Sequence, residues 1–227
     1  MDNNCSPKIT ILLANPRGFC AGVERAIEIV NRALLKYKTP IYVNHEIVHN
    51  TYVIQNLKKR GVIFVDNISE VPNHSVIIFS AHGVSDKVEK ESKFKHLKII
   101  DATCPLVKKV HIQGKQFEKD KRKIILIGHH NHPEVQATKG RINQEIFIVE
   151  KLCDIDKIPY SHKDPISYIT QTTLSVDDTK KIINNIKTKF PNIKGPDLNH
   201  ICYATQNRQH AVKKNISSCR HYFCHWC

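Results

Sequence analysis

The chain has 227 residues, enough for one large or two modest domains, and it carries a formal net charge of +14. No apolar run approaches the roughly 20 residues that a membrane-spanning helix needs, and the polar stretch from Met1 to Lys8 predicts no signal peptide. We therefore expect a cytoplasmic protein without a membrane partner, whose eight cysteines are metal ligands or free thiols and not disulfides.

The positive charge permits two interpretations. The 35 Lys and Arg residues against 21 Asp and Glu suit a negatively charged partner such as a phosphate, a nucleic acid or an acidic protein. The lysines are also spread along the whole chain, as AT-rich coding would spread them, and that pattern is equally typical of a solvated surface. Charge alone does not choose between the two.

The first predicted elements surround a cysteine. An apolar run over residues 9–14 predicts a strand, and Asn15-Pro-Arg-Gly-Phe-Cys20 follows as a turn. A helix is predicted to begin at Cys20, because apolar residues recur after it at helical spacing. This stripe consists of Val23, Ala26, Ile27, Val30 and Leu34.

The rest of the first hundred residues predicts alternating strands and helices. We expect strands at 40–44, 62–65 and 76–80, a helix at 51–60 that ends before Gly61, and a polar helix after Ser85. Such alternation is typical of parallel α/β units, in which ligands collect at the C-terminal ends of the strands. His49 and His82 follow strands at that end, and Gly83 would let a ligand approach the backbone closely.

The same rhythm continues beyond residue 120. We expect strands at 124–128 and 146–149, a strand ending at 170–173, a helix at 179–190 opened by a capping box at Ser175, and a boundary loop at 191–196. His132 and Glu134 follow the first of these strands, and Thr172 lies at the end of the third.

Two more cysteines stand where helices are predicted to begin. Cys104 precedes a helical stretch through Val107 and Val110, and Cys202 precedes another, at domain-like intervals from Cys20. The backbone N–H groups and the dipole of a helix N-terminus favour the thiolate, which is the metal-binding form. A single such cysteine is more often a small buried hydrophobe, but three in parallel contexts predict three related α/β units that each donate one thiolate to a common centre.

The polar residues at the strand ends indicate a site beside these thiolates. His49, His82 and His132 fall at matching strand ends, and charged histidines are good donors to phosphate oxygens; taken singly, each would more often be structural. Glu134 could act as a general acid or base if burial raises its pKa, or simply stabilise the first turn of a helix after Pro133. Thr172 could hold a water or a substrate hydroxyl, or serve as a β-forming residue.

Three cysteines can hold a four-iron cluster with one iron uncovered, and an open coordination position is what catalysis at a metal requires. Zinc with three thiolates is the competing arrangement. The long spacings fit neither a zinc finger nor a ferredoxin, so spacing alone does not choose between the metals.

Seven blocks of sequence stand out over roughly residues 9–214: Asn15-Pro-Arg-Gly-Phe-Cys-Ala-Gly-Val-Glu-Arg-Ala, His45-Glu-Ile-Val-His-Asn, Ser80-Ala-His-Gly-Val-Ser, Asp101-Ala-Thr-Cys-Pro-Leu-Val, His132-Pro-Glu-Val, Thr170-Gln-Thr-Thr-Leu-Ser-Val-Asp-Asp-Thr and Ile201-Cys-Tyr-Ala-Thr-Gln-Asn-Arg-Gln. In these blocks, and in their order, the chain resembles a known family, the 4-hydroxy-3-methylbut-2-enyl diphosphate reductases of the non-mevalonate isoprenoid pathway.

The resemblance implies a trefoil of three α/β units, over residues 1–100, 101–196 and 197–227, around a [4Fe–4S] cluster. It implies that Cys20, Cys104 and Cys202 bind the cluster, that His49 and His82 bind the substrate diphosphate, that His132 lines the pocket, that Glu134 delivers protons and that Thr172 positions the substrate hydroxyl or its water. The implied reaction removes that hydroxyl with two electrons from a ferredoxin or flavodoxin and two protons, giving isopentenyl and dimethylallyl diphosphates, and it needs no nucleic acid.

The resemblance ends after Lys214. The family continues with an apolar strand and a Ser-x-Asn turn, whereas this chain has an aberrant tail from Asn215. Cys219, Cys224 and Cys227 in the tail have spacings that suggest a zinc site. A frameshift in a run of adenines explains the tail sequence better than a zinc site does. We therefore expect the third unit to be mostly missing. The alternatives to an active reductase are therefore an inactive truncated remnant and a basic zinc- or nucleic-acid-binding protein.

Overall fold

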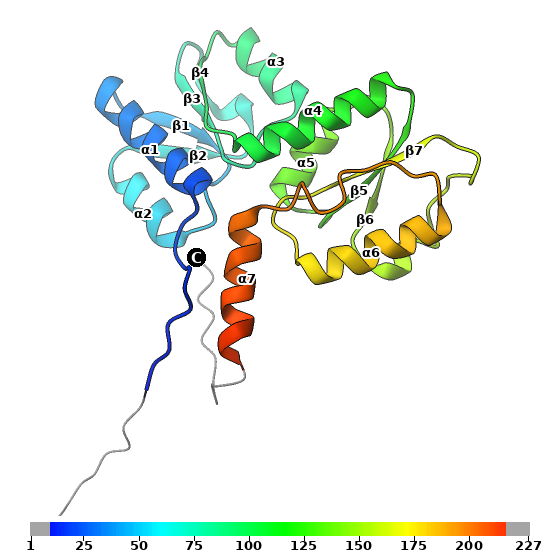
Figure 1. Cartoon of the computed structure of the whole chain (residues 1–227). Coiled ribbons are helices and arrows are strands. Elements are labelled where there is room, and N and C mark those ends of the chain that lie inside the picture. The colour runs from blue at the N-terminus through cyan, green and yellow to red at the C-terminus, as the bar shows by residue number, and fades with distance from the viewer. Residues whose placement is uncertain (1–9, 217–227) are drawn as a thin grey trace, which may run out of the picture.

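Residues 10–216, which the computed structural model describes, form two parallel α/β units and a final helix (Figure 1). The first sheet has the strand order β2-β1-β3-β4 and the second has the order β6-β5-β7, and the paired strands are parallel. The predicted α/β class is therefore confirmed. The strands are β1 (Ile41–Asn44), β2 (Val62–Val65), β3 (Val76–Phe79), β4 (Lys98–Asp101), β5 (Lys123–Ile127), β6 (Ile146–Val149) and β7 (Ile166–Thr170).

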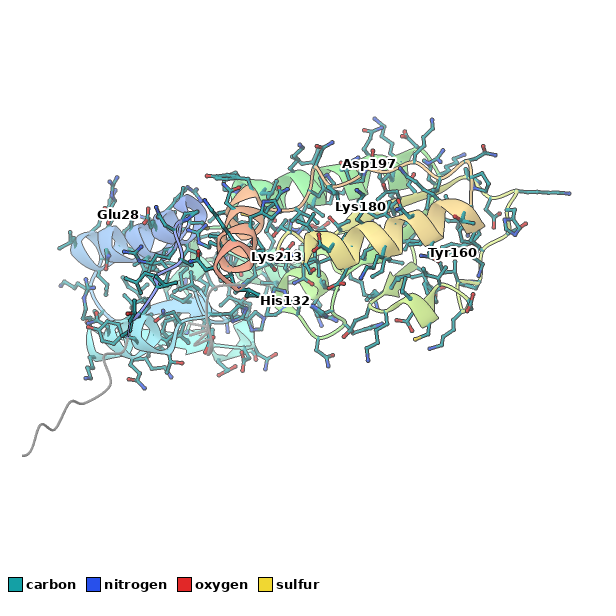
Figure 2. The ribbon with its side chains drawn as sticks, turned by 60° about the horizontal axis from the view of Figure 1, so that its bottom comes forward. Glu28, His132, Tyr160, Lys180, Asp197 and Lys213 are labelled. Carbon is teal, nitrogen blue, oxygen red and sulfur yellow. The ribbon has the colours of Figure 1, made fainter. Side chains whose placement is uncertain are left out.

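Helices connect these strands and cover the sheets. They are α1 (Ala21–Lys36), α2 (Thr51–Lys59), α3 (Asp86–Phe94), α4 (Pro105–Lys119), α5 (Pro133–Lys139), α6 (Val176–Lys189) and α7 (Tyr203–Ile216), with short 3-10 turns η1 (Ile68–Glu70) and η2 (Leu152–Asp154). Helix α7 follows the last strand of the second sheet and lies between the two units (Figure 1 and Figure 2).

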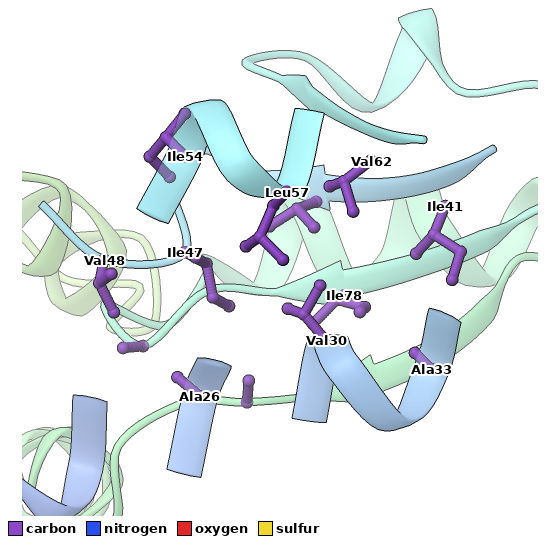
Figure 3. Packing of buried hydrophobic residues seen from close by; sticks show 13 residues of the cluster. Ala26, Val30, Ala33, Ile41, Ile47, Val48, Ile54, Leu57, Val62 and Ile78 are labelled. Carbon is purple, nitrogen blue, oxygen red and sulfur yellow. The ribbon is translucent and has the colours of Figure 1, made fainter. Parts of the chain in front are cut away.

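The first unit buries apolar side chains on both faces of its sheet. Ile41 and Val43 of β1 pack in one cluster with Val30 of α1 and Leu57 of α2 (Figure 3). Tyr42 points to the other face, where it joins a second cluster beneath η1 and α3. Because both faces are covered, the sheet holds the loops at its strand ends in fixed places.

The second unit repeats this arrangement. Ile125 and Ile127 of β5 pack with Ile186 of α6, whereas Ile124 and Leu126 point to the opposite face, toward α4. Successive side chains along β5 therefore point to opposite faces of the sheet, as the pleat of a strand requires.

Most predicted boundaries agree with the structure. Helix α2 ends at Lys59, and Gly61 follows it with φ of +92°, a left-handed conformation that glycine adopts readily. Helix α6 begins at Val176, earlier than the predicted residue 179, because the Ser175 hydroxyl already accepts a hydrogen bond from the Asp178 N–H and caps the helix there.

The predicted first strand, residues 9–14, is wrong for the part that is described. Residues 10–14 form no strand, and Ile11, Leu12 and Leu13 are 79%, 52% and 66% exposed. A strand needs a neighbouring strand that completes its hydrogen bonds, and neither described sheet accepts this segment.

Several expectations fall outside the described residues or remain open. The stretch from Met1 to Lys8 and the tail cysteines Cys219, Cys224 and Cys227 lie outside them. The division into units at residues 100 and 196 stays a proposal. Among the helices within residues 10–216, none combines the length and apolarity required to cross a bilayer.

Candidate active site

Three helices each begin directly after a cysteine. Cys20, Cys104 and Cys202 immediately precede α1, α4 and α7, as the sequence predicted, and each is partly buried. Cys20 and Cys104 are the N-cap residues of their helices, so their sulfurs lie beside backbone N–H groups that have no partner within the helix.

The three thiols come together at the start of α1. Cys20 and Cys202 share a side-chain hydrogen bond. A Cβ atom added at Gly22 would lie 3.0 Å from the Cys104 sulfur and 3.7 Å from the Cys20 sulfur. Residues far apart in the chain therefore place three sulfurs around one short helix turn, the convergence that the sequence predicted.

The Cys20 sulfur is held as a thiolate. The hydrogen bond from Cys202 lowers the pKa of Cys20 to about 5, and the backbone N–H groups of Val23 and Gly22 lower it further against the opposing effect of burial. The same shared proton raises the pKa of Cys202. Thiolate is the form of cysteine that binds metals, so this end of α1 is suited to a metal centre.

A second cluster consists of His49, His82 and His132, which come from three different loops. Their ring centroids are 4.4 Å apart for His49 and His82, and 5.5 and 5.6 Å from each of these to His132. One ring nitrogen from each lies within 4.8 Å of the others. The structure thus brings together the three histidines that the strand ends predicted.

These loops are connected to the cysteine turns through the backbone. The Cys104 N–H donates to the Ala81 carbonyl, next to His82, at 3.0 Å. The Cys202 N–H donates to the Thr172 carbonyl at 2.7 Å. The thiols and the polar residues therefore form one site.

Two of the histidines are neutral near pH 7, contrary to the expected charged donors. Burial, then the neighbouring His49 and His132, lower the pKa of His82 to about 3. Burial also lowers the pKa of His132 to about 4. Desolvation disfavours the imidazolium form, and a second positive charge a few ångströms away would add repulsion.

The hydrogen bonding of His132 decides where its remaining proton lies. His132 caps α5, and its Nδ1 atom accepts a hydrogen bond from the Glu134 N–H at 3.1 Å. The neutral ring must then carry its proton on Nε2. This side chain therefore carries an N–H donor on Nε2 that can bind an anion.

Glu134 follows His132 by two residues, and its side chain is almost completely buried. Its two carboxyl oxygens accept hydrogen bonds from the Thr172 N–H at 2.7 Å and from the Thr172 hydroxyl at 2.9 Å. Burial nevertheless raises the pKa of Glu134 to about 7, because the two bonds only partly offset the loss of water. A carboxyl group with this pKa can hold or release a proton near neutral pH.

Comparison with known proteins identifies the family to which this site belongs. A model described as LytB protein matches residues 11–221. The sequence is 54% identical over 213 residues to the 4-hydroxy-3-methylbut-2-enyl diphosphate reductase of Marinobacter nauticus, covering 92% of this chain and 67% of that protein. The chain belongs to the 4-hydroxy-3-methylbut-2-enyl diphosphate reductase family.

Further members of this reductase family agree. The enzyme of Wolbachia pipientis is 55% identical over an alignment that covers 90% of this chain and 67% of that protein. The structure of the E-1-hydroxy-2-methyl-but-2-enyl-4-diphosphate reductase from Plasmodium falciparum superposes with a TM-score of 0.88 at 46% identity, covering 90% of this chain and 64% of that one. A second solved structure, titled as the terminal enzyme of the non-mevalonate pathway, gives a TM-score of 0.76 at 32% identity, covering 92% of this chain and 73% of that one.

These relatives support the predicted architecture. The chain spans about two thirds of the length of the curated reductases it matches. This agrees with a trefoil of three α/β units, of which the described residues form two and α7, the first helix of the third.

Some residues of the site were missed or misread from the sequence. Gly83 was expected to let a ligand approach the backbone. It has φ of +80°, and a Cβ there would lie 2.8 Å from Cε1 of His111, so backbone conformation and packing are enough to require glycine at this position. Ser80, whose hydroxyl lies 3.4 Å from Nδ1 of His82, was not singled out. Arg25 and Arg208 were also missed, although both lie within the family blocks and bind loops beside the cysteines.

Proposed function

We propose that this chain catalyses the reductive dehydroxylation of (E)-4-hydroxy-3-methylbut-2-enyl diphosphate. Two electrons and two protons enter, the carbon–oxygen bond of the hydroxyl breaks, and water leaves together with isopentenyl or dimethylallyl diphosphate. The observation that carries this proposal is the convergence of three helix-terminal thiols with three histidines and a buried carboxyl group of pKa about 7.

A [4Fe–4S] cluster bound by Cys20, Cys104 and Cys202 would supply the electrons and an open iron position that polarises the hydroxyl oxygen. The residues fit such a group. The donor set is entirely sulfur, one thiol is already ionised, and Gly22 has no side chain between the sulfurs of Cys20 and Cys104. The N-termini of α1 and α4 would stabilise the negative charge of four sulfur-ligated irons.

His49, His82 and His132 are proposed to bind the diphosphate. Neutral imidazoles bind phosphate oxygens through N–H donors, and the Nε2 proton of His132 is available for this. A bound diphosphate would also raise the pKa of each ring that it touches, because a negative charge favours the imidazolium form.

Glu134 is proposed to provide a proton to the reacting centre. Its carboxyl group is protonated in about half of the molecules at its pKa of about 7. The Thr172 hydroxyl donates its proton to this carboxyl group at 2.9 Å, so its oxygen could accept a hydrogen bond from the substrate hydroxyl or from the water formed from it. The buried position keeps bulk water away from the transfer.

The electron donor is proposed to be a ferredoxin or a flavodoxin. Such acidic proteins are attracted by a chain with a net charge of +14, and electrostatic attraction accelerates their encounter.

Purification without air tests the proposal directly. The protein should contain roughly four irons per chain, absorb broadly at about 400 nm and convert the substrate when supplied with a reductant. Cys202→Ser should lose the iron, whereas Cys153→Ser, at an exposed cysteine outside the site, should retain it. One zinc per chain and no iron would refute the cluster, and full cluster occupancy without turnover would refute the activity.

A further inference from the structure

Two arginines connect the cysteine turns to one another. Arg208 of α7 donates from Nε to the Gly18 carbonyl at 2.8 Å and from a terminal nitrogen to the Phe19 carbonyl at 2.7 Å. These are the two residues immediately before Cys20. The side chain thus holds the turn of one cysteine from the helix of another, across a sequence separation of 189 residues or more.

Arg25 of α1 makes the same kind of contact with the turn before the second cysteine, Cys104. Its guanidinium donates to the Ala102 carbonyl at 3.4 Å and to the Thr103 carbonyl at 3.2 Å. These are the two residues immediately before Cys104. Arg25 lies just beyond the first turn of the Cys20 helix, as Arg208 does in the Cys202 helix.

The third helix has a cation in the corresponding place. Lys109 lies in α4 at the same distance after Cys104 as Arg25 after Cys20. It is close enough to His200, in the turn before Cys202, for its charge to act on that buried imidazole. Neither ring nitrogen of His200 has a hydrogen-bond partner among the described residues, so Lys109 does not tie this turn. The two arginine contacts run in one direction, from the Cys20 helix to the Cys104 turn and from the Cys202 helix to the Cys20 turn.

We infer that Arg25 and Arg208, together called the arginine clamp, are positioning residues that hold the three thiols at the spacing a shared metal centre requires. This inference rests on the proposed metal-binding role of the cysteines. It goes further in assigning the fixed spacing to cationic side chains outside the ligand set.

The physical basis is the geometry of the guanidinium group. Its planar fork of donors can bind two neighbouring carbonyls at once, and it remains charged at all relevant pH values. Arg208 uses two of these donors, Nε and a terminal nitrogen, on the two carbonyls before Cys20. Arg25 reaches the two carbonyls before Cys104 from one terminal nitrogen. Each contact fixes the backbone directly before a cysteine and so limits the positions that its sulfur can take.

Binding of Co²⁺ to the iron-free protein tests whether the arginine clamp positions the three thiols, and it requires neither a cluster nor turnover. Thiolate ligation produces a sulfur-to-cobalt charge-transfer band, whose intensity reports how many thiolates bind one ion. Arg25→Gln and Arg208→Gln should weaken Co²⁺ binding about ten- to a hundredfold, as loss of outer partners of metal ligands does, and reduce the band at saturation.

Controls separate positioning from folding. Arg32→Gln alters an exposed arginine of α1 that, within residues 10–216, pairs with Glu28, and it should leave Co²⁺ binding unchanged. Arg208→Lys retains the charge but not the fork, and its affinity should lie between those of wild type and Arg208→Gln. Melting temperatures of the metal-free proteins identify any variant that fails to fold, and the arginine variant that remains folded then decides.

The outcomes distinguish this inference from the proposed function. Unchanged Co²⁺ affinity and band intensity in folded Arg25→Gln and Arg208→Gln would overturn the clamp, as would a wild-type protein whose thiols do not bind Co²⁺ together. A third outcome separates the two. If the wild type binds Co²⁺ through three thiolates and the arginine variants bind it more weakly, but the wild type accepts no iron, the clamp is supported and the cluster is refuted.

Discussion

Replacement of Glu134 by glutamine separates its charge from its shape. Glu134 is 2% exposed, and both carboxyl oxygens accept hydrogen bonds from Thr172. Glutamine has nearly the same volume and its carbonyl oxygen can still accept one of these bonds. It carries neither an ionisable group nor a proton that can be transferred.

The size of the effect follows from the pKa. Burial raises the pKa of Glu134 from 4.5 to about 7. The unfolded chain releases this proton near the lower value, so the free energy of unfolding falls as the pH rises from one value to the other. At 1.36 kcal/mol per pKa unit, the complete shift corresponds to about 3 kcal/mol. Glu134→Gln should therefore exceed wild type in stability by up to about 3 kcal/mol above pH ~8, where ionisation is complete.

Urea unfolding of the metal-free proteins measures this difference. The gap between Glu134→Gln and wild type should grow by about 2 kcal/mol between pH ~5 and pH ~8.5. Taking the difference cancels the contributions of His82 and His132, whose lowered pKa values are present in both proteins. A gap that is the same at both pH values would show that Glu134 is not held protonated, and the reasoning would fail.

The same substitution should abolish proton delivery. Turnover should fall about 10²- to 10⁴-fold, the usual contribution of a general acid. Wild-type turnover should decline as the pH rises above about 7, where Glu134 loses its proton, and the residual activity of Glu134→Gln should lack this decline.

Three further substitutions test the site and its packing. Gly22→Ala should lower the iron content by more than half, because its Cβ would lie 3.0 Å from the Cys104 sulfur and displace it; Ala21→Gly is the control that should retain iron. His132→Gln should weaken binding of inorganic pyrophosphate about tenfold by calorimetry, the worth of one hydrogen bond, whereas His74→Gln, in the separate stacked pair with His96, should not. Gly83→Ala should lower the free energy of unfolding by about 1–3 kcal/mol, since it adds a left-handed φ for alanine to a 2.8 Å contact with His111; unaltered stability would contradict this.

The sequence by itself determined the local elements and the order of the chemical groups along the chain. The apolar stripe of α1, the glycine after α2 and the serine that caps α6 act through neighbours within a few residues, so they can be read without the fold. The three cysteines and three histidines were also predictable, because parallel strands bring their C-terminal ends to one edge and the blocks matched a family.

Only the tertiary structure decided the properties that depend on distant neighbours. Residues 10–14 look like a strand, but neither described sheet pairs with them. His82 and His132 are neutral because other elements remove their water, and desolvation leaves no trace in a local sequence pattern. The hydrogen bonds of Arg25 and Arg208 to carbonyls beside other cysteines join residues 77 and 190 positions apart, and backbone carbonyls are the same at every residue. Such contacts become visible only once the helices have been placed.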